Sequence, residues 1–186
     1  SGAATARLRG IYATKLNDST VLSFAGDDDD LYKLNTSTFA LDSINSGYTM
    51  TGDMYWKFVR FGDEVIAAGN DTDSLQGFTV GTDSAFATVS GAPAARELAV
   101  IRDFVVTGNV SYSGGTHRSR VRWSAINDAT SWTIGTNQAD FQDIPDAGQI
   151  TGLVGGEYGV VLLEKAIARM QYVGSPLIFT FEKVET

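Results

Sequence analysis

The chain has 186 residues, of which 22 are acidic and 14 basic, so its formal net charge is -8. Binding to nucleic-acid phosphates requires clustered lysine and arginine, and this balance therefore argues against a generic nucleic-acid-binding protein. The chain has no cysteine, which excludes a disulfide framework and a thiolate metal site.

Short apolar segments separated by Gly, Asn and Asp predict a chain of β-strands. The segments recur as a unit: a strand, an acidic or glycine turn, a second strand, a loop, and a further strand that usually carries an aromatic side chain. The first two units place these strands at residues 11–16, 20–26 and 31–34, and at residues 56–61, 64–69 and 75–78. The last two units place them at residues 98–101, 104–108 and 121–124, and at residues 150–154, 158–163 and 167–172.

Acidic residues in the first turn of every unit mark the register of this repeat. They lie 45, 40 and 54 residues apart, at Asp18, Asp63, Asp103 and Glu157. A period of about 40–50 residues with three or four strands per unit is typical of propeller blades. The sequence therefore predicts an all-β fold, a β-propeller of about four blades with three to four antiparallel strands each.

The four expected blades form a single propeller region, at residues 8–50, 51–92, 93–146 and 147–186. A blade cannot bury both faces alone, so we expect it to stack on its neighbours, with its first strand innermost and buried on both faces. Because the chain begins Ser-Gly and stops directly after a strand-like run, we expect a fragment of a longer chain and an incomplete ring. A β-sandwich, whose strands also recur with frequent turns, is the alternative.

Helical spacing is found best at residues 164–171, where Ala166, Ile167 and Met170 fall on one helical face. Both flanks of this segment have the composition of strands. We therefore expect residues 164–166 to form a hairpin turn and no helix.

No catalytic residue is predicted. The one histidine, His117, is expected in a glycine-rich loop, and the chain has neither a Gly-x-Ser-x-Gly motif nor a cysteine nucleophile. We therefore expect a protein that is not an enzyme and has no cofactor.

The run Asp27–Asp30 offers carboxylates, which suit Ca²⁺. Four adjacent acids cannot all point at one ion, and their like charges repel. We expect a solvated loop at a blade edge and predict no metal site, although the run leaves cation binding open. Residues 70–73 hold the equivalent place in the second unit, which predicts that both loops lie on one rim.

Arginines alternate with other residues at Arg118, Arg120 and Arg122. On a strand, this spacing places all three side chains on one face. Such a face could bind the carboxylates of a neighbouring subunit or a phosphate backbone. A solvent-facing outer strand is the alternative.

A carbohydrate-binding propeller or glycosidase is the main rival from another functional class. Two of the turn acids would have to face a bound sugar, whereas Asp is also simply a good turn former. The aromatic side chains of Tyr48, Tyr55 and Trp56 are candidates for stacking on a sugar. A propeller interaction domain of a larger cytoplasmic protein is a third reading.

Two motifs near the C-terminus carry a family resemblance. An Arg-Val-x-Trp-Ser segment precedes an Asn-Asp-Ala-x-x-Trp segment within residues 120–133, and Tyr-x-Gly-x-Pro-x-x-Phe lies within residues 170–183. They resemble motifs in the tail hub or nozzle proteins of short-tailed double-stranded DNA bacteriophages, including the packaged-DNA stabilisation family. The resemblance is clearest over residues 98–186. The matching positions are Arg120, Val121, Trp123, Ser124, Trp132, Tyr172, Gly174, Pro176 and Phe179.

The resemblance implies a virion tail structural protein that retains and conducts packaged DNA. Members of that family look like propellers assembled as a homo-oligomeric ring, often a hexamer, below the portal. The implied partners are copies of the chain, neighbouring tail or portal proteins and double-stranded DNA in transient, nonspecific passage during ejection. No membrane is implied, and the implied locations are the virion tail and the host cytoplasm during assembly. The motif residues Trp123, Trp132, Tyr172, Gly174 and Pro176 are packing and turn residues, and this chain is shorter than the family members.

Overall fold

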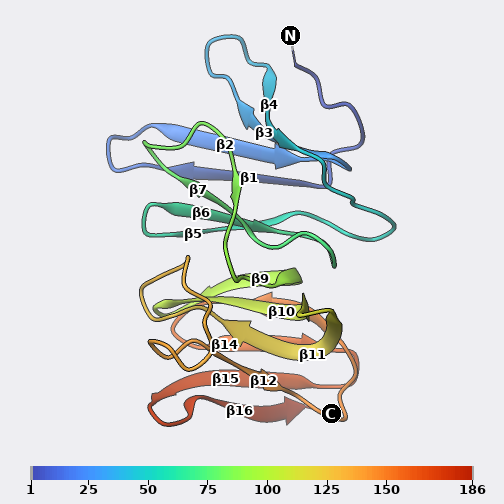
Figure 1. Ribbon diagram of the computed structural model, residues 1–186, viewed down its shortest axis with the longest axis vertical. Helices are drawn as coiled ribbons and strands as arrows, with labels where there is room; N and C mark the ends of the chain where they lie inside the picture. Colours follow the sequence, from blue (N-terminus) through green and yellow to red (C-terminus); the bar gives the residue numbers. More distant parts are fainter. Residues whose placement is uncertain (1, 186) are drawn as a thin grey trace.

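The computed structural model describes residues 2–185, which form sixteen strands and no helix. The strands make four separate sheets, each of four antiparallel strands in chain order (Figure 1). This arrangement confirms the predicted all-β fold. It excludes the sandwich alternative, because the strands lie in four stacked sheets and not in two facing ones.

The bounds of the strands follow the predicted units. The first sheet contains β1 (Gly10–Lys15), β2 (Val21–Gly26), β3 (Asp30–Leu34) and β4 (Leu41–Ser46). The second contains β5 (Lys57–Phe61), β6 (Glu64–Ala68), β7 (Gln76–Thr79) and β8 (Ala87–Thr88). The third contains β9 (Ala94–Ile101), β10 (Phe104–Tyr112), β11 (Gly115–Trp123) and β12 (Asp140–Asp143). The fourth contains β13 (Ile150–Val154), β14 (Gly159–Leu163), β15 (Ile167–Gly174) and β16 (Ile178–Glu185).

The sheets stack face to face and do not close into a ring. The innermost strands β1, β5, β9 and β13 pack in that order, each against the next. Figure 1 shows the first sheet at one end of the long axis and the outer strands of the fourth sheet at the other. The structure is thus the incomplete propeller that the sequence predicts.

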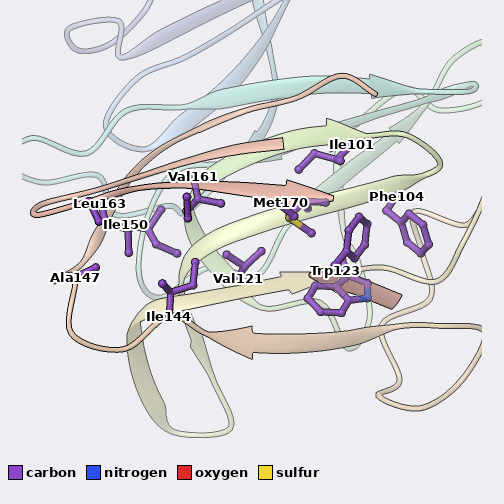
Figure 2. Close-up of a cluster of buried hydrophobic side chains, with 14 of the residues drawn as sticks. Ile101, Phe104, Val121, Trp123, Ile144, Ala147, Ile150, Val161, Leu163 and Met170 are labelled. Atoms are coloured by element: carbon purple, nitrogen blue, oxygen red, sulfur yellow. The ribbon is translucent and has the colours of Figure 1, made fainter. Parts of the chain in front are cut away.

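Three buried apolar layers hold neighbouring sheets together. In β6, Val65 belongs to the layer with the first sheet, while Ile66 belongs to the layer with the third sheet. This alternation follows from the two-residue period of a strand. The layer between the third and fourth sheets contains Val121, Trp123 and Met170 (Figure 2). The second and third sheets therefore bury both of their faces.

The first strand of each sheet is innermost, but it is not the most buried one. Strand β5 is half-buried throughout, whereas Val65 and Ile66 of β6 are fully buried. The expectation that the innermost strand is buried on both faces is therefore wrong for β1, β5 and β13. Each of them forms an edge of its sheet, while the second strand has a strand on either side. Strand β9 is also an edge strand but is mostly buried, and it packs on β5, β6 and β13.

The hairpins are as predicted. Each of the four turn acids lies between the first and second strands of its sheet. Residues 164–166 join β14 to β15, which pair antiparallel, so this segment is a turn. Two turn acids also form exposed ion pairs, Asp63 with Arg60 at 3.7 Å and Glu157 with Arg102 at 3.4 Å.

A Gly-Asp or Gly-Asn pair lies at the end of the second strand in the first two sheets, at residues 26–27 and 69–70, and at a bulge inside the second strand of the third sheet, at residues 108–109. A Cβ atom on Gly26 would lie 2.3 Å from the ring of Trp56, which enters the second sheet. A Cβ atom on Gly108 would lie 3.0 Å from Ile150, which begins β13. At Gly26 a side chain would displace the Trp56 ring, and at Gly108 it would press on the Ile150 side chain, because the chain leading to the next sheet packs directly on the strand.

Candidate functional site

The strand β11 carries the three predicted arginines on one face. Val121 and Trp123 point from the opposite face into the layer shared with the fourth sheet. Arg118, Arg120 and Arg122 therefore face the side of the second sheet. Each guanidinium group is held by contacts within the chain, and the three sites differ.

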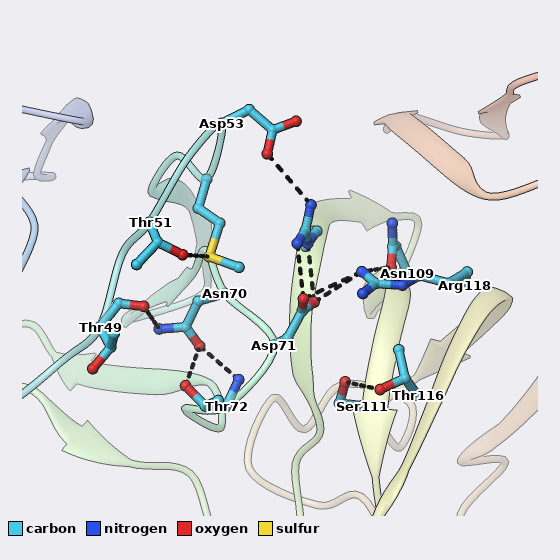
Figure 3. A network of polar contacts seen from close by, with 12 residues as sticks. Thr49, Thr51, Asp53, Asn70, Asp71, Thr72, Asn109, Ser111, Thr116 and Arg118 are labelled. Carbon is cyan, nitrogen blue, oxygen red and sulfur yellow. Dashed lines mark hydrogen bonds and ion pairs between the residues drawn. The ribbon is translucent and has the colours of Figure 1, made fainter.

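Arg118 lies in an ion-pair network between the second and third sheets (Figure 3). Its Nη1 donates to both carboxylate oxygens of Asp71 at 3.2 Å and to the Oδ1 of Asn109 at 3.2 Å. Arg96 binds the same carboxylate in two places, with Nε at 3.0 Å and Nη2 at 2.8 Å. One carboxylate on the loop after β6 thus connects β9 and β11.

The charge on Asp71 is stabilised by these two arginines. Burial opposes ionisation of the carboxyl group, but the hydrogen bonds and charges of Arg96 and Arg118 outweigh it, so the pKa of Asp71 lies below its ordinary value. Asp53 adds a weaker contact to Arg96 at 3.7 Å from an exposed position. The two arginines therefore favour the ionised form of the Asp71 carboxyl group.

Arg120 forms a two-pronged pair with Asp143 on the neighbouring strand β12, both contacts measuring 2.8 Å. Its guanidinium carbon also lies 3.8 Å from the ring centre of Phe141. The hydrogen bond to Arg120 lowers the pKa of Asp143. This arginine therefore links β11 to β12, the outermost strand of the third sheet.

Arg122 is buried, with 2 % of its surface exposed. Its guanidinium carbon lies 3.7 Å from the ring centre of Tyr112 and 5.8 Å from that of Trp132. Nη2 donates to the carbonyl oxygens of Trp132 at 2.7 Å and Gly91 at 3.2 Å, while Nε and Nη1 have no hydrogen-bond partner among the described residues. Burial lowers its pKa.

The expectation of an exposed or interfacial arginine face is therefore wrong for Arg122. The loop that carries Trp132 folds back over the strand, and aromatic rings take the place of water around the cation. Arg118 has the most exposed side chain of the three, at 42 %, against 16 % for Arg120. A contact between these residues and phosphate or a partner stays a prediction, and Arg118 is the residue placed to make it.

The run Asp27–Asp30 does not form one solvated cluster. Asp27 is fully buried and accepts hydrogen bonds from the backbone amides of Asp29 and Asp30 and from the hydroxyl of Tyr32, at 3.0, 2.8 and 2.7 Å. The expectation of a solvated loop is wrong for this residue, because its oxygens cap the turn. Asp28 instead pairs with Arg9.

Asp27 also anchors the N-terminal segment, because its Oδ2 accepts from the backbone amides of Thr5 at 3.2 Å and Ala6 at 3.1 Å. Burial opposes the charge, but the hydrogen bonds from Tyr32 and from backbone amides outweigh it and lower the pKa of Asp27 to about 2. Within residues 2–185, no three His, Cys, Asp or Glu side chains gather as metal ligands would.

Asn70 plays the same role in the second sheet. Its Oδ1 accepts from the backbone amide of Thr72 at 3.0 Å (Figure 3) and from that of Asp73 at 2.7 Å. The loops that follow Asp27 and Asn70 both join the second strand of a sheet to the third, and so lie on the same rim. The sequence pattern located this equivalence, but it did not show that the first residue of each loop is a buried cap.

The aromatic residues considered for sugar stacking are mostly core residues. Tyr48 is 7 % exposed and donates its hydroxyl to Gln76 at 3.1 Å, and Trp56 is 5 % exposed and donates its Nε1 to the carbonyl of Asp27 at 2.9 Å. Only Tyr55 is exposed among the three. The structure therefore provides no stacking platform from these three residues, because two of them fill the layer between the first and second sheets.

His117 lies on β11 opposite Val110 of β10, and not in a loop as expected. The glycine-rich turn ends at Gly114, and β11 begins at Gly115, two residues before His117, because β10 and β11 are longer than their apolar runs. The described residues hold no helix long and apolar enough to cross a membrane.

The residues that carry the family resemblance are packing and turn residues, as their types indicate. Trp123 and Trp132 are each 2 % exposed, and Tyr172 donates its hydroxyl to Gln138 at 3.0 Å. Gly174 ends β15 with a φ of 79°, and Pro176 lies exposed in the following turn. A scan against protein-family models found no match to this chain, and a search of the curated proteins found none either.

Proposed function

We propose that the chain is a structural component of the tail of a short-tailed double-stranded DNA bacteriophage, where it helps to retain and conduct the packaged genome. The observation that carries the proposal is the placement of the two resembling segments. Residues 120–133 and 170–183 pack on one another across the layer between the third and fourth sheets, with the rings of Trp123 and Phe179 5.0 Å apart. The resemblance therefore falls on one packed unit and not on two unrelated turns.

The architecture supports a mechanical role. Three continuous apolar layers join the sheets, and the network around Asp71 ties the second sheet to the third with charge-assisted hydrogen bonds. A stack of this kind resists deformation, because close-packed protein interiors have low compressibility. The proposal gives the chain no reaction to catalyse and no cofactor.

The charge distribution supports passage of DNA without capture. The net charge is -8, and the arginines Arg96 and Arg120 already bind carboxylates of the chain. Nonspecific DNA affinity comes from cations that neutralise phosphates, and it falls steeply with salt. A surface with few available cations lets a duplex slide past.

Labelling of virions tests the proposal. Antibodies against the purified chain should bind the tail in electron micrographs of the phage that encodes it, with pre-immune serum as the control. Label on the head alone, or chain recovered only outside particles, would contradict the virion role. In a mobility assay with a random-sequence duplex at low salt, we expect no stable complex. A complex whose affinity falls steeply with salt would contradict the conduit role.

A further inference from the structure

The outward face of the first sheet is apolar and is exposed along the innermost strand β1, whereas Ala25 and Tyr32 on the same face are 3 % and 2 % exposed, with Thr5 of the N-terminal segment on the Tyr32 hydroxyl. In β2, Phe24 points into the layer with the second sheet, so Val21 and Ala25 point outward. Ile11 of β1 is 77 % exposed and Val21 is 47 % exposed. A hollow of about 290 Å³ on this side is lined mainly by apolar residues, among them Leu8, Ile11, Ala13, Ala25, Leu34 and Leu41.

The outward face of the fourth sheet is also apolar. In β14, Val161 points into the layer with the third sheet, so Val160 points outward with its cross-strand partner Val154, which is 55 % exposed. Val184 of β16 is 63 % exposed. A second hollow, of about 390 Å³, is lined by Tyr158, Val160, Ile167, Arg169 and Val184.

Neighbouring sheets are joined three times in the chain, and each time the face of one sheet that points toward the next packs on the face that points back. The outward faces of the first and fourth sheets are one face of each kind. In the second sheet, the pair Phe58 and Ala67 faces the preceding sheet, and Phe58 stacks on Tyr12 with ring centres 6.0 Å apart. In the first sheet, Ile11 and Ala25 form a cross-strand pair that faces outward, away from the second sheet. The first sheet therefore offers the face that receives a preceding sheet.

The fourth sheet offers the other kind of face. In the third sheet, Ile101 and Phe104 form the cross-strand pair next to the first hairpin turn, and both lie in the layer with the following sheet. The pair in the same place of the fourth sheet is Val154 and Val160, which face outward. A contact between the two free faces would therefore be head to tail, as a heterologous contact is.

We propose that the outward face of the fourth sheet packs on the outward face of the first sheet of a second copy, which continues the stack across the two chains. The occupant is a second copy because this junction is continuous with the three inside the chain and joins the same two kinds of face. Exposed apolar surfaces of this kind mark interaction sites. Two copies joined at both ends supply eight sheets, four from each, which is within the usual 4–8 blades of a closed propeller. This inference rests on the free faces and holds whether or not the chain acts in a virion.

Disulfide mapping tests the contact, because the chain has no cysteine of its own. In the expected junction β1 of one copy lies beside β13 of the other, as β1 lies beside β5 within the chain. A tagged Ala13→Cys variant mixed with an untagged Val154→Cys variant should form a cross-linked pair on mild oxidation, because Ala13 is exposed on the outward face of β1 at the level of Val154 in β13. A mixture of tagged Ala13→Cys with untagged Ile134→Cys is the matched control, since Ile134 is exposed in the loop before β12. Equal cross-linking in both mixtures, or none in either, overturns the proposal.

Light scattering of the unmodified chain supplies an independent measurement. At about 100 μM, well above a micromolar dissociation constant, the mass should be that of two copies. The Ile11→Glu variant should have the mass of one copy with an unchanged circular dichroism spectrum, because it places a charge in the apolar junction. A single-copy mass for the unmodified chain overturns the proposal, as does a mass that grows without limit with concentration. These outcomes leave the tail-labelling result untouched, so the two proposals fail separately.

Discussion

The rings of Trp123 and Phe179 meet edge to face, with centres 5.0 Å apart and planes inclined at 71°. Trp123 ends β11 in the third sheet and Phe179 lies on β16, the outermost strand of the fourth. Aromatic pairs favour this geometry because the positive edge of one ring meets the negative face of the other. The contact joins the two segments that carry the family resemblance.

Truncation of this contact should weaken the fourth sheet. Phe179→Ala removes a ring that is 5 % exposed, and we expect the free energy of unfolding to fall by about 3–5 kcal/mol. Leu177→Ala is the matched control, because Leu177 is 66 % exposed two residues away and should cost less than about 0.5 kcal/mol. Urea titration followed by tryptophan fluorescence measures both. Equal costs for the two variants would refute a core role for Phe179.

Gly26 should tolerate no side chain while Trp56 is present. A Cβ atom there would lie 2.3 Å from the indole ring, and overpacking of this kind costs about 1–3 kcal/mol. We expect Gly26→Ala to lower the thermal midpoint. In the double variant with Trp56→Leu, the alanine should add little further loss, because the clash is gone. Additive losses in the two single variants and the double variant would speak against the clash.

The acid stability of the chain should depend on Asp27. The folded-state pKa of about 2 lies below the ordinary value of 3.8, so the unfolded chain binds the proton first. The stability that this carboxylate contributes is present above about pH 4 and is lost as the pH falls toward 2, by about 2 kcal/mol in all. The free energy of unfolding, measured by urea titration at each pH, should fall less steeply with acid for Asp27→Asn than for the unmodified chain.

Asp29→Asn is the control for that titration, because Asp29 is an exposed neighbour in the same loop. It should keep the acid slope of the unmodified chain. An Asp27→Asn variant with the slope of the unmodified chain would show that Asp27 does not carry the effect. Hydrogen exchange at Thr5 and Ala6, whose amides donate to Asp27, should also quicken in Asp27→Asn.

The carboxylate of Asp71 should couple the second and third sheets. Asp71→Asn removes the charge that Arg96 and Arg118 share, and we expect a loss of about 1–3 kcal/mol. Asp53→Asn, at the exposed edge of the same network, should cost under about 1 kcal/mol. A double-mutant cycle between Asp71→Ala and Arg118→Ala measures the coupling, and additivity within error would mean that the pair is not coupled.

The sequence predicts the sheets well where strands are apolar and alternate. It did not place the fourth strand of the first three sheets, because segments such as β4 and β12 are short and polar and are held by pairing to the third strand. It also placed His117 in a loop. The ladder between β10 and β11 extends beyond the apolar residues, and no local pattern marks that extension.

The candidate site was harder to predict than the fold. The alternation of Arg118, Arg120 and Arg122 placed the three residues on one face, but their partners come from elsewhere in the chain. Asp71 forms an ion pair with Arg118, which lies 47 positions later in the sequence. Arg122 donates a hydrogen bond to the carbonyl oxygen of Trp132, which lies in a loop. Charge spacing alone therefore could not distinguish an exposed basic face from three separately neutralised cations.

The sequence by itself determined the all-β class, the hairpin turns and the division into four sheets, because strand periodicity and turn residues act over a few neighbouring positions. Only the tertiary structure decided which polar groups are buried and which apolar faces stay open. In the sequence, Asp27 is one of four adjacent acids and is expected to be solvated. In the structure it is buried, and it accepts hydrogen bonds from the backbone amide of Ala6 and the hydroxyl of Tyr32. In the sequence, Ile11 and Val154 do not differ from apolar strand residues that are buried. They are exposed in the structure because no other sheet of the chain packs on them, and burial depends on that neighbour and not on the residue alone.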